Sequence, residues 1–259
     1  MIAIEHIQTV FGARVIARDV SLEIPAGMIT CIIGQSGEGK SVLLKQIMGL
    51  IKPTAGHIYI DGIDITNEQN PHRADALKKC GYVFQFAALL DSLTIFENIG
   101  LALIEQGKSS IEIRHAVHEA LALVNLPEAI LHAYPSELSG GMRKRVGIAR
   151  TIVKKPEYIL YDEPTTGLDP ITSRLIHELM RQIQRELGVT SIVVSHDIEV
   201  FKFVDYVALL HEGVIKYTGP ADTIWKTNNS YVQQFIRGFP IKEVPDYTAC
   251  LPKGIGAVR

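Results

Sequence analysis

The sequence contains no stretch of the roughly 18 consecutive apolar residues that a helix needs to cross a bilayer, so we expect no membrane-spanning segment. Its first residues, MIAIEHIQTVFGARV, lack the basic start and long apolar run of a signal peptide, and we expect no secretion signal. The mean hydropathy of +0.15 is nevertheless high for a chain in which we expect no membrane-spanning segment. Buried partner surfaces, or a parallel sheet covered on both faces, would each account for it.

Cysteine is scarce and net charge is close to zero. The three cysteines, Cys31, Cys80 and Cys250, include no C-x-x-C pair, which argues against a disulfide scaffold or a zinc ribbon and fits a reducing cytosol. Lys and Arg number 26 against 28 Asp and Glu, a formal net charge of −2. This balance provides no strong global field to attract nucleic acid or an anionic membrane, although it is compatible with a local basic patch.

The 259 residues, 47% of them apolar, can bury a full core as one large domain or two small ones. Apolar runs at 28–33, in YILYDE and in TSIVVSHD alternate with helical segments, the first of which is VLLKQIMGL. This alternation predicts a parallel sheet with helical crossovers. Between Ile2 and Ile24 apolar and polar residues alternate as in half-buried strands, and HIYIDG predicts another strand.

The middle of the chain is predicted to be helical. Residues 94–126 carry one apolar stripe, made of Ile113, Ala116, Val117, Ala120, Leu121 and Val124. We expect a helical subdomain at about 86–156, inserted into a single domain that covers 1–239. The last residues, 240–259, contain three prolines and no period, and they predict an extended tail.

A glycine-rich loop follows the apolar run at 28–33. Residues 34–41, GQSGEGKS, match G-x-x-x-x-G-K-[ST] between a predicted strand and a predicted helix. The glycines let successive backbone N–H groups turn toward phosphate oxygens, and the helix N-terminus adds its positive dipole end. Lys40 would lie between β- and γ-phosphates, and the Ser41 hydroxyl would ligate Mg²⁺. A plain glycine turn is the alternative, but the strand–loop–helix context favours a phosphate site.

Polar side chains follow two later strands. The apolar run at 158–161 ends in Asp162, which could reach the metal, and Glu163, which could polarise a water for attack on the γ-phosphate. A solvated loop start is an equally good interpretation of this pair taken alone. His196 follows the next strand; a lone histidine is more often structural, but the strand order would bring it to the same edge of the sheet.

A third motif, LSGGM at 138–142, precedes a segment rich in Lys and Arg. Ser139 is a good N-cap, and Gly140 and Gly141 would leave backbone amides open to an anion. The alternative is an ordinary capped helix with a solvated basic face, and that cluster could be mistaken for a nucleic-acid patch.

With these motifs in this order, residues 1 to about 238 resemble the nucleotide-binding subunit of an ABC transporter. An aromatic A-loop residue (Phe11), a Q-loop (Gln85 in YVFQ) and a D-loop (GLD, 167–169) complete the set. Two positions depart from the usual pattern, Met142 in place of Gln and Val42 in place of Thr. The resemblance implies an α/β P-loop NTPase core with a mainly parallel sheet, an N-terminal antiparallel β region and the inserted helical subdomain.

The resemblance also implies roles for individual residues. It assigns ATP contacts to Phe11, Gly34, Ser36, Gly37, Glu38, Gly39, Lys40, Ser41, Val42, Ser139, Gly140, Gly141 and Asp169. It assigns Mg²⁺ to Ser41, Gln85 and Asp162, and hydrolysis to Glu163, His196 and Gln85. Two chains would sandwich two ATP molecules head to tail, and closure on ATP would drive a separate membrane permease.

Finer features resemble the MlaF-type ATPase of MCE-associated lipid transporters. The stretches FQFAALLDSLTIFENI, ELSGGMRKRVGIAR and ILYDEPTTGLDP carry this resemblance. It implies phospholipid transport linked to outer-membrane asymmetry, a peripheral position on the cytoplasmic side of the bacterial inner membrane, an MCE protein and a STAS-domain protein as partners, and no nucleic-acid partner.

Two alternatives stay open. The first is the ATPase of another ABC importer, for amino acids or ions, which would share all of this chemistry. The second is a soluble ABC ATPase that acts on nucleic acid or ribosomes. Members of that group usually show a long coiled-coil insertion, zinc modules or tandem cassettes, and the sequence has none of these.

Overall fold

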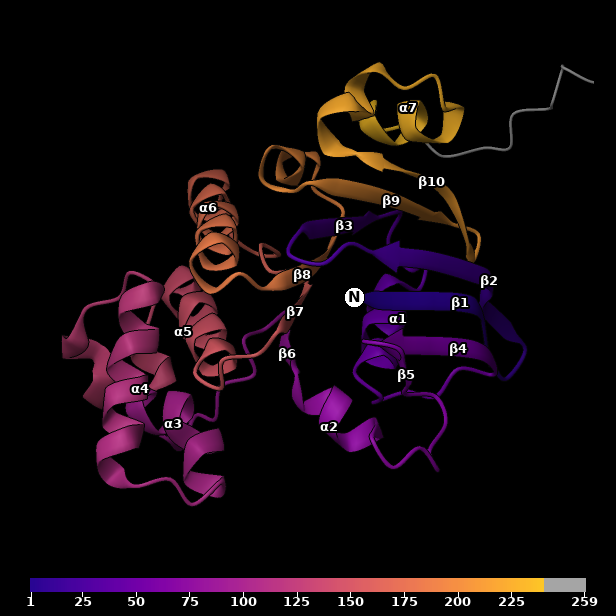
Figure 1. Cartoon of the computed structure of the whole chain (residues 1–259). Helices are drawn as coiled ribbons and strands as arrows, with labels where there is room; N and C mark the ends of the chain where they lie inside the picture. Colours follow the sequence, from indigo (N-terminus) through magenta and orange to yellow (C-terminus); the bar gives the residue numbers. More distant parts are fainter. Residues whose placement is uncertain (240–259) are drawn as a thin grey trace, which may run out of the picture.

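The computed structural model describes residues 1–239, and a mixed sheet forms its centre (Figure 1). Within these residues ten strands pair in the order β5-β4-β1-β2-β10-β9-β3-β8-β7-β6. Their bounds are β1 Ile2–Phe11, β2 Arg14–Ile24, β3 Ile29–Ile33, β4 Ala55–Ile60, β5 Ile63–Asp64, β6 Cys80–Val83, β7 Tyr158–Asp162, β8 Thr190–Ser195, β9 Tyr206–His211 and β10 Val214–Pro220. The predicted tail at 240–259 lies outside the described residues.

Strand direction divides the sheet into two parts. β1, β2, β4 and β5 pair antiparallel. β6, β7, β8, β3 and β9 pair parallel in that order, and β10 returns antiparallel to β9. The sheet therefore has the predicted mainly parallel core and the predicted antiparallel N-terminal region. Because parallel strands end at one edge, the residues that follow β3, β7 and β8 meet there.

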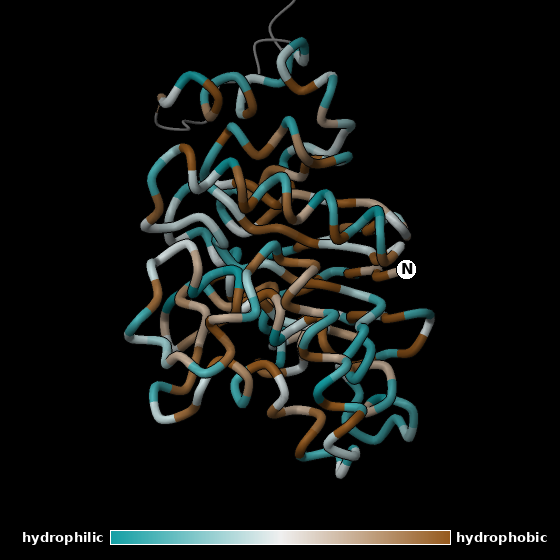
Figure 2. The backbone as a smooth tube through the Cα atoms, turned by 90° about the vertical axis from the view of Figure 1, so that its left-hand side faces the viewer, coloured by the Kyte–Doolittle hydropathy of each residue, from teal (hydrophilic) through white to brown (hydrophobic). Residues whose placement is uncertain are grey.

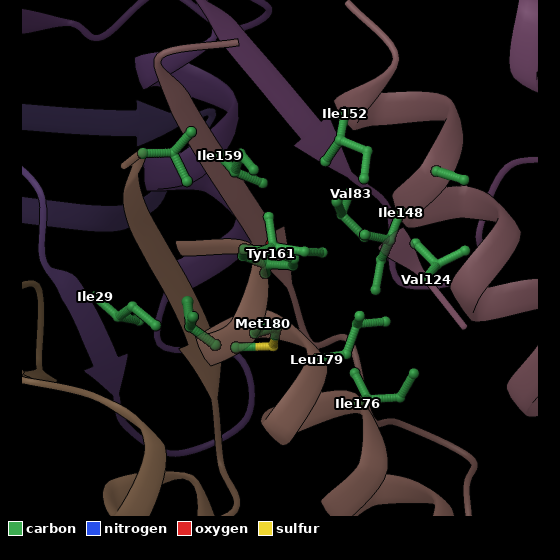
Figure 3. Packing of buried hydrophobic residues seen from close by; sticks show 14 of the residues in the cluster. Ile29, Val83, Val124, Ile148, Ile152, Ile159, Tyr161, Ile176, Leu179 and Met180 are labelled. Atoms are coloured by element: carbon green, nitrogen blue, oxygen red, sulfur yellow. The ribbon is translucent and has the colours of Figure 1, made fainter. Parts of the chain in front are cut away.

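The central strands are buried on both faces because helices cover both. α1 (Lys40–Ile47) packs on one face, in a cluster with Ile32 of β3 and Leu160 of β7. α5 (Gly140–Ile152) and α6 (Pro170–Leu187) pack on the other, and Figure 3 shows Tyr161 of β7 among their side chains. This double cover explains the continuous apolar runs in these strands.

The predicted helical stretch at 94–126 is two helices, α3 (Ile95–Glu105) and α4 (Ser110–Leu123). The chain turns between them at Gly107, whose φ is 71°, and Ser109 caps α4 through a capping box with Glu112. The predicted apolar stripe is confirmed, since all its members except the half-buried Ala116 are buried. In Figure 1, α3, α4 and α5 stand together on the side of the molecule away from β1 and β4.

Shorter helices complete the part of the chain that the structure describes. They are α2 (Arg73–Lys78), α7 (Ser230–Ile236) and single 3₁₀ segments at Glu128–His132, Pro135–Glu137, Ile198–Phe203 and Ala221–Lys226. In Figure 2, hydrophobic stretches of the chain (brown) run through the middle of the molecule. Across residues 1–239, no helix combines the length and the apolar character that a membrane span requires.

Candidate nucleotide-binding site

The glycine-rich loop connects β3 to α1, as the sequence predicts, and three of its glycines are required by geometry. A Cβ at Gly34 would lie 2.4 Å from the carbonyl oxygen of Leu210. Gly37 and Gly39 have φ values of 84° and 93°, which residues other than glycine rarely adopt. The loop conformation is therefore fixed partly by close contact with the end of β9. Gln35, Ser36 and Gly37 form its exposed tip, and Val42 is half-buried in α1.

Lys40 is buried at the start of α1. Its Nζ donates to the carbonyl oxygens of Gly34 at 2.9 Å and Gln35 at 2.8 Å, so the ammonium group is held at the loop itself. Burial lowers the pKa of Lys40, and the negative charge of Glu163 opposes that shift. A bound phosphate would add a further negative charge beside this partly desolvated cation.

The turn between β1 and β2 lies over the loop. Arg14 donates to the carbonyl oxygen of Gly37 at 3.2 Å, and a Cβ at Gly39 would lie 2.5 Å from Ile16 Cγ2. Phe11, the last residue of β1, pairs with Arg14 and is 47% exposed. The hairpin that contacts the loop thus carries an aromatic ring accessible to a flat ligand.

Asp162 lies at the end of β7 and is buried. Its Oδ1 accepts a hydrogen bond of 2.6 Å from Ser41 Oγ, and its Oδ2 accepts one of 2.7 Å from the Tyr82 hydroxyl. The sequence pattern did not identify Tyr82, although it lies three residues before Gln85. Burial, and then the hydrogen bond to Asp162, raise the pKa of Tyr82, so the phenol stays protonated and donates.

Two other predicted site residues, Gln85 and His196, converge on Glu163. Its Oε2 lies 3.5 Å from both Gln85 Nε2 and His196 Nδ1, and it accepts a hydrogen bond of 2.9 Å from Thr166 Oγ1. Its φ of 45° is in the left-handed region, and its backbone N–H donates to Val194 of β8 at 3.0 Å. Such a backbone conformation costs about 1–3 kcal/mol and persists only where the surroundings hold it.

The motif at 138–142 lies at a different place. Ser139 caps α5 by accepting from the backbone N–H of Met142 at 3.3 Å, and Asp169 caps α6 by accepting from two backbone N–H groups. With Gly140 and Gly141 these residues line a hollow of about 310 Å³. Residues 34–42 are not among the described residues of its lining. Within one chain the structure therefore does not bring the two halves of the predicted ATP site together.

The basic cluster of α5 is used internally. Arg143, Lys144, Arg145 and Arg150 each donate to a backbone carbonyl oxygen, those of Leu138, Gln85, Asn125 and Ala88 respectively. Two of these bonds hold the segment 85–88, in which Ala87 and Ala88 have φ values of 61° and 49°. Neither a nucleic-acid patch nor a freely solvated basic face describes this arrangement. The cluster positions the Q-loop and the segment before α5.

Among residues 1–239 no group of three or more His, Cys, Asp and Glu side chains is arranged to hold a metal ion alone. The donors that the family resemblance assigns to Mg²⁺ are a hydroxyl, a carboxylate and an amide oxygen, from Ser41, Asp162 and Gln85. Hard oxygen ligands of this kind fit Mg²⁺, which in phosphate sites is completed by substrate oxygens and water. The donor set therefore suits an ion that arrives with a nucleotide.

Comparison with known proteins places this geometry in a family. The model of the ABC transporter family matches residues 17–166. The chain belongs to this family: it is the ATP-binding subunit of an ABC transporter, an ATPase coupled to transport. Such cassettes act as dimers with a membrane permease, and the predicted P-loop NTPase fold class is confirmed.

Individual relatives are similar over most of the chain. The methionine import ATP-binding protein MetN of Desulfitobacterium hafniense strain Y51 is 39% identical over 252 residues, which cover 95% of this chain and 74% of the relative. MetN of Cupriavidus metallidurans is 40% identical over 230 residues, 88% of this chain and 67% of that one. A solved dimeric ATP-binding cassette in a post-hydrolysis state, with ADP and phosphate bound, has a TM-score of 0.77 at 34% identity and covers 85% of this chain and 99% of that one.

These relatives correct the finer prediction. The assignment to MlaF-type lipid-transporter ATPases is wrong, because the relatives are methionine import ATP-binding proteins. The MCE and STAS-domain partners were implied by that assignment alone and have no support. The physical reason lies in the stretches that suggested it: ELSGGMRKRVGIAR and ILYDEPTTGLDP surround residues of the ATPase site, and FQFAALLDSLTIFENI contains Gln85 of the same site. Cassettes for different cargoes share this chemistry, so these stretches do not report the substrate.

Proposed function

We propose that this chain hydrolyses ATP at the loop 34–41 to drive import of an amino acid, with methionine as the first candidate. The convergence of Ser41, Asp162, Glu163 and Gln85 beside that loop carries the ATPase proposal. Support for the substrate comes from the relatives named above, which are methionine import proteins.

ATP would be held by contacts from three elements. The exposed ring of Phe11 offers a face for the adenine base, and stacking of this kind needs no base-specific hydrogen bonds. Backbone N–H groups of 34–41 and the N-terminus of α1 face the phosphates, while Lys40 neutralises part of their charge. Ser36 and Glu38 lie within the loop 34–41, and Val42 follows it in the first turn of α1.

Mg²⁺ would be held by the Ser41 hydroxyl, the Asp162 carboxylate and the amide oxygen of Gln85. When bound, the ion would offset the negative charge that develops on the phosphate oxygens. Tyr82 fixes the carboxylate by donating to Oδ2, which leaves Oδ1 directed at Ser41. The amide nitrogen of Gln85 faces Glu163, so its oxygen is left for the metal.

Hydrolysis would depend on Glu163. Its carboxylate accepts a proton from a water molecule as the water oxygen bonds to the γ-phosphorus and the bond to the bridging oxygen of ADP breaks. Thr166 and Gln85 orient the carboxylate from two sides. The 58% exposed side chain of His196 would donate to a γ-phosphate oxygen as charge builds there.

A second chain would complete the site. Because the hollow that contains Ser139, Gly141 and Asp169 is separate from the loop, these groups would cap a γ-phosphate held by the other chain of a dimer. Ser139 supplies a hydroxyl and the start of α5 supplies backbone N–H groups. The complex would sit on the cytoplasmic side of a bacterial inner membrane, with this subunit peripheral to it.

Uptake measurements in the native host test the substrate. Deleting the gene is expected to abolish high-affinity uptake of radiolabelled methionine, because the permease would lose its energy source. The wild-type gene should restore uptake, and a Glu163→Gln copy should not. Glutamate uptake serves as the control for general damage. If methionine uptake is unchanged and uptake of another amino acid is lost, that amino acid is the substrate instead. Unchanged uptake of every amino acid tested would contradict the import proposal.

The permease is expected to contact the segment 86–96, which follows the Q-loop. The structure divides the apolar side chains of this segment: Leu89 and Phe96 pack against the core, whereas Phe86 is 80% and Leu90 43% exposed. The side-chain amide of Asn98 holds the backbone of Leu90 by two hydrogen bonds: its oxygen accepts from the Leu90 N–H, and its nitrogen donates to the Leu90 carbonyl oxygen. A substitution of the Leu90 side chain should therefore leave this backbone in place.

Leu90→Asp is expected to lower transport by the assembled complex by about tenfold or more, because a charge would be buried against the permease. ATP binding by the isolated subunit should not change. Ile111→Asp, at an 83% exposed position on α4, is the matched control and should transport normally. If the Leu90→Asp complex assembles and transports as the wild type does, the segment 86–96 does not contact the permease through Leu90.

A further inference from the structure

The phosphate loop contains a negatively charged residue of its own. Glu38 lies between Gly37 and Gly39, within the segment that would bind an anionic triphosphate. Its charge reaches the phosphate-binding cation: burial lowers the pKa of Lys40, and the carboxylates of Glu163 and then Glu38 act in the opposite direction. An unrestrained carboxylate here would repel phosphate, because both charges lie in a partly desolvated site.

Both oxygens of this carboxylate are held from outside the loop. Oε1 lies 2.9 Å from Nδ1 of His211, and Oε2 accepts the backbone N–H of Glu212 at 2.7 Å. A carboxylate only accepts hydrogen bonds, so Nδ1 carries the proton in this contact. The side chain of Glu38 is 14% exposed and that of His211 6% exposed. The pair is therefore largely shielded from solvent, unlike a surface ion pair.

His211 is in turn fixed by its surroundings. It is the last residue of β9, and the ring of Tyr231 on α7 lies 5.8 Å from its ring. Lys216 of β10 places its Nζ 5.1 Å from the centre of the Tyr231 ring. The following turn is tied to β2, since Gly213 accepts from the backbone N–H groups of Arg18 and Asp19 at 2.8 and 3.2 Å.

We propose that Glu38 and His211 form a positioning pair that draws the loop's own carboxylate away from the phosphates. Through this pair the affinity of the loop for nucleotide depends on the β9–β10 turn and on α7, which are distant in sequence. This inference rests on the proposed binding of the triphosphate by residues 34–41. The pair is not part of the reacting groups; it acts by holding a charge in place.

Removal of His211 tests the pair. His211→Ala is expected to raise the Kd of Mg²⁺–ATP by about tenfold, because the Glu38 carboxylate keeps only its contact with the Glu212 N–H and can turn toward the phosphates. The rise for ADP should be smaller, since ADP carries less charge. Glu38→Ser in the same chain should return the Kd to within about twofold of the wild-type value. Equilibrium titration with fluorescent ATP and ADP analogues measures all of these, and thermal unfolding checks that each variant is folded.

His118→Ala is the matched control, because His118 of α4 makes a similar contact of 2.8 Å with Glu128 far along the chain from the loop. It should bind ATP as the wild type does. If His211→Ala unfolds, His211→Leu, of similar volume, takes its place in the same comparison. A loss that persists in the double variant, or that is equal for ATP and ADP, would indicate a packing role and overturn the inference.

The failure of the proposed function would look different. Lys40→Ala binding ATP as well as the wild type would contradict binding at the loop itself. With Lys40→Ala weakened as expected, wild-type affinity in His211→Ala would overturn only the positioning pair.

Discussion

Glu163→Gln is expected to lower ATP turnover of the assembled transporter by about 10²–10⁴-fold while ATP still binds. The amide has almost the same shape as the carboxylate and can still accept from Thr166, so the geometry around it should survive. It cannot take a proton from the attacking water. Phosphate release gives the turnover, and titration with a fluorescent ATP analogue gives the affinity.

The matched control for this variant is Glu157→Gln, which lies just before β7, at the opposite end of the strand that leads to Glu163. It should hydrolyse ATP at the wild-type rate. Near wild-type turnover in Glu163→Gln would contradict the catalytic assignment. Weakened ATP binding in the same variant would instead indicate that Glu163 holds the loop, since its charge also acts on Lys40.

Local motifs were enough to predict the parts of the site that depend on backbone shape. The loop 34–41 needs glycines at positive φ between a buried strand and a helix. All of these features lie in consecutive residues, so a sequence motif can reveal them. Asp162 ends one buried parallel strand and His196 follows its neighbour, so the sheet brings both residues to the same edge. The proximity of Gln85, Glu163 and His196 agrees with the predicted grouping, while their roles stay predictions.

Contacts between distant segments could not be predicted in this way. Tyr82 reaches Asp162 across 80 residues, and Glu38 reaches His211 across 173. Neither pair has a spacing that a sequence pattern could reveal. The basic residues of α5 were ambiguous for a related reason: their charge suggested solvent or a polyanion, but their partners are backbone carbonyls of loops folded against the helix. Cargo was mispredicted because the motifs describe ATP chemistry.

The two-chain site predicts that two inactive variants should complement each other. Lys40→Ala removes the cation of the phosphate loop, and Ser139→Arg obstructs the cap that acts on the other chain's loop. Each variant alone should be almost inactive, because both sites of its dimer carry the lesion. A mixed dimer has one doubly damaged site and one in which the loop and the cap are both intact. ATPase activity in an equal mixture should therefore reach roughly a quarter of wild type if the chains pair at random.

Pairing Lys40→Ala with Glu163→Gln supplies the control. Both of these lesions fall on the loop side of a site, so a mixed dimer of the two contains no intact site and should stay inactive. Chains carrying different affinity tags show whether mixed dimers form in each case. Complementation by Ser139→Arg but not by Glu163→Gln would require the loop of one chain and the cap of the other to act together. If mixed dimers form and neither mixture gains activity, residues 139–141 do not complete the partner's site, and the separate hollow around Ser139 must have another use.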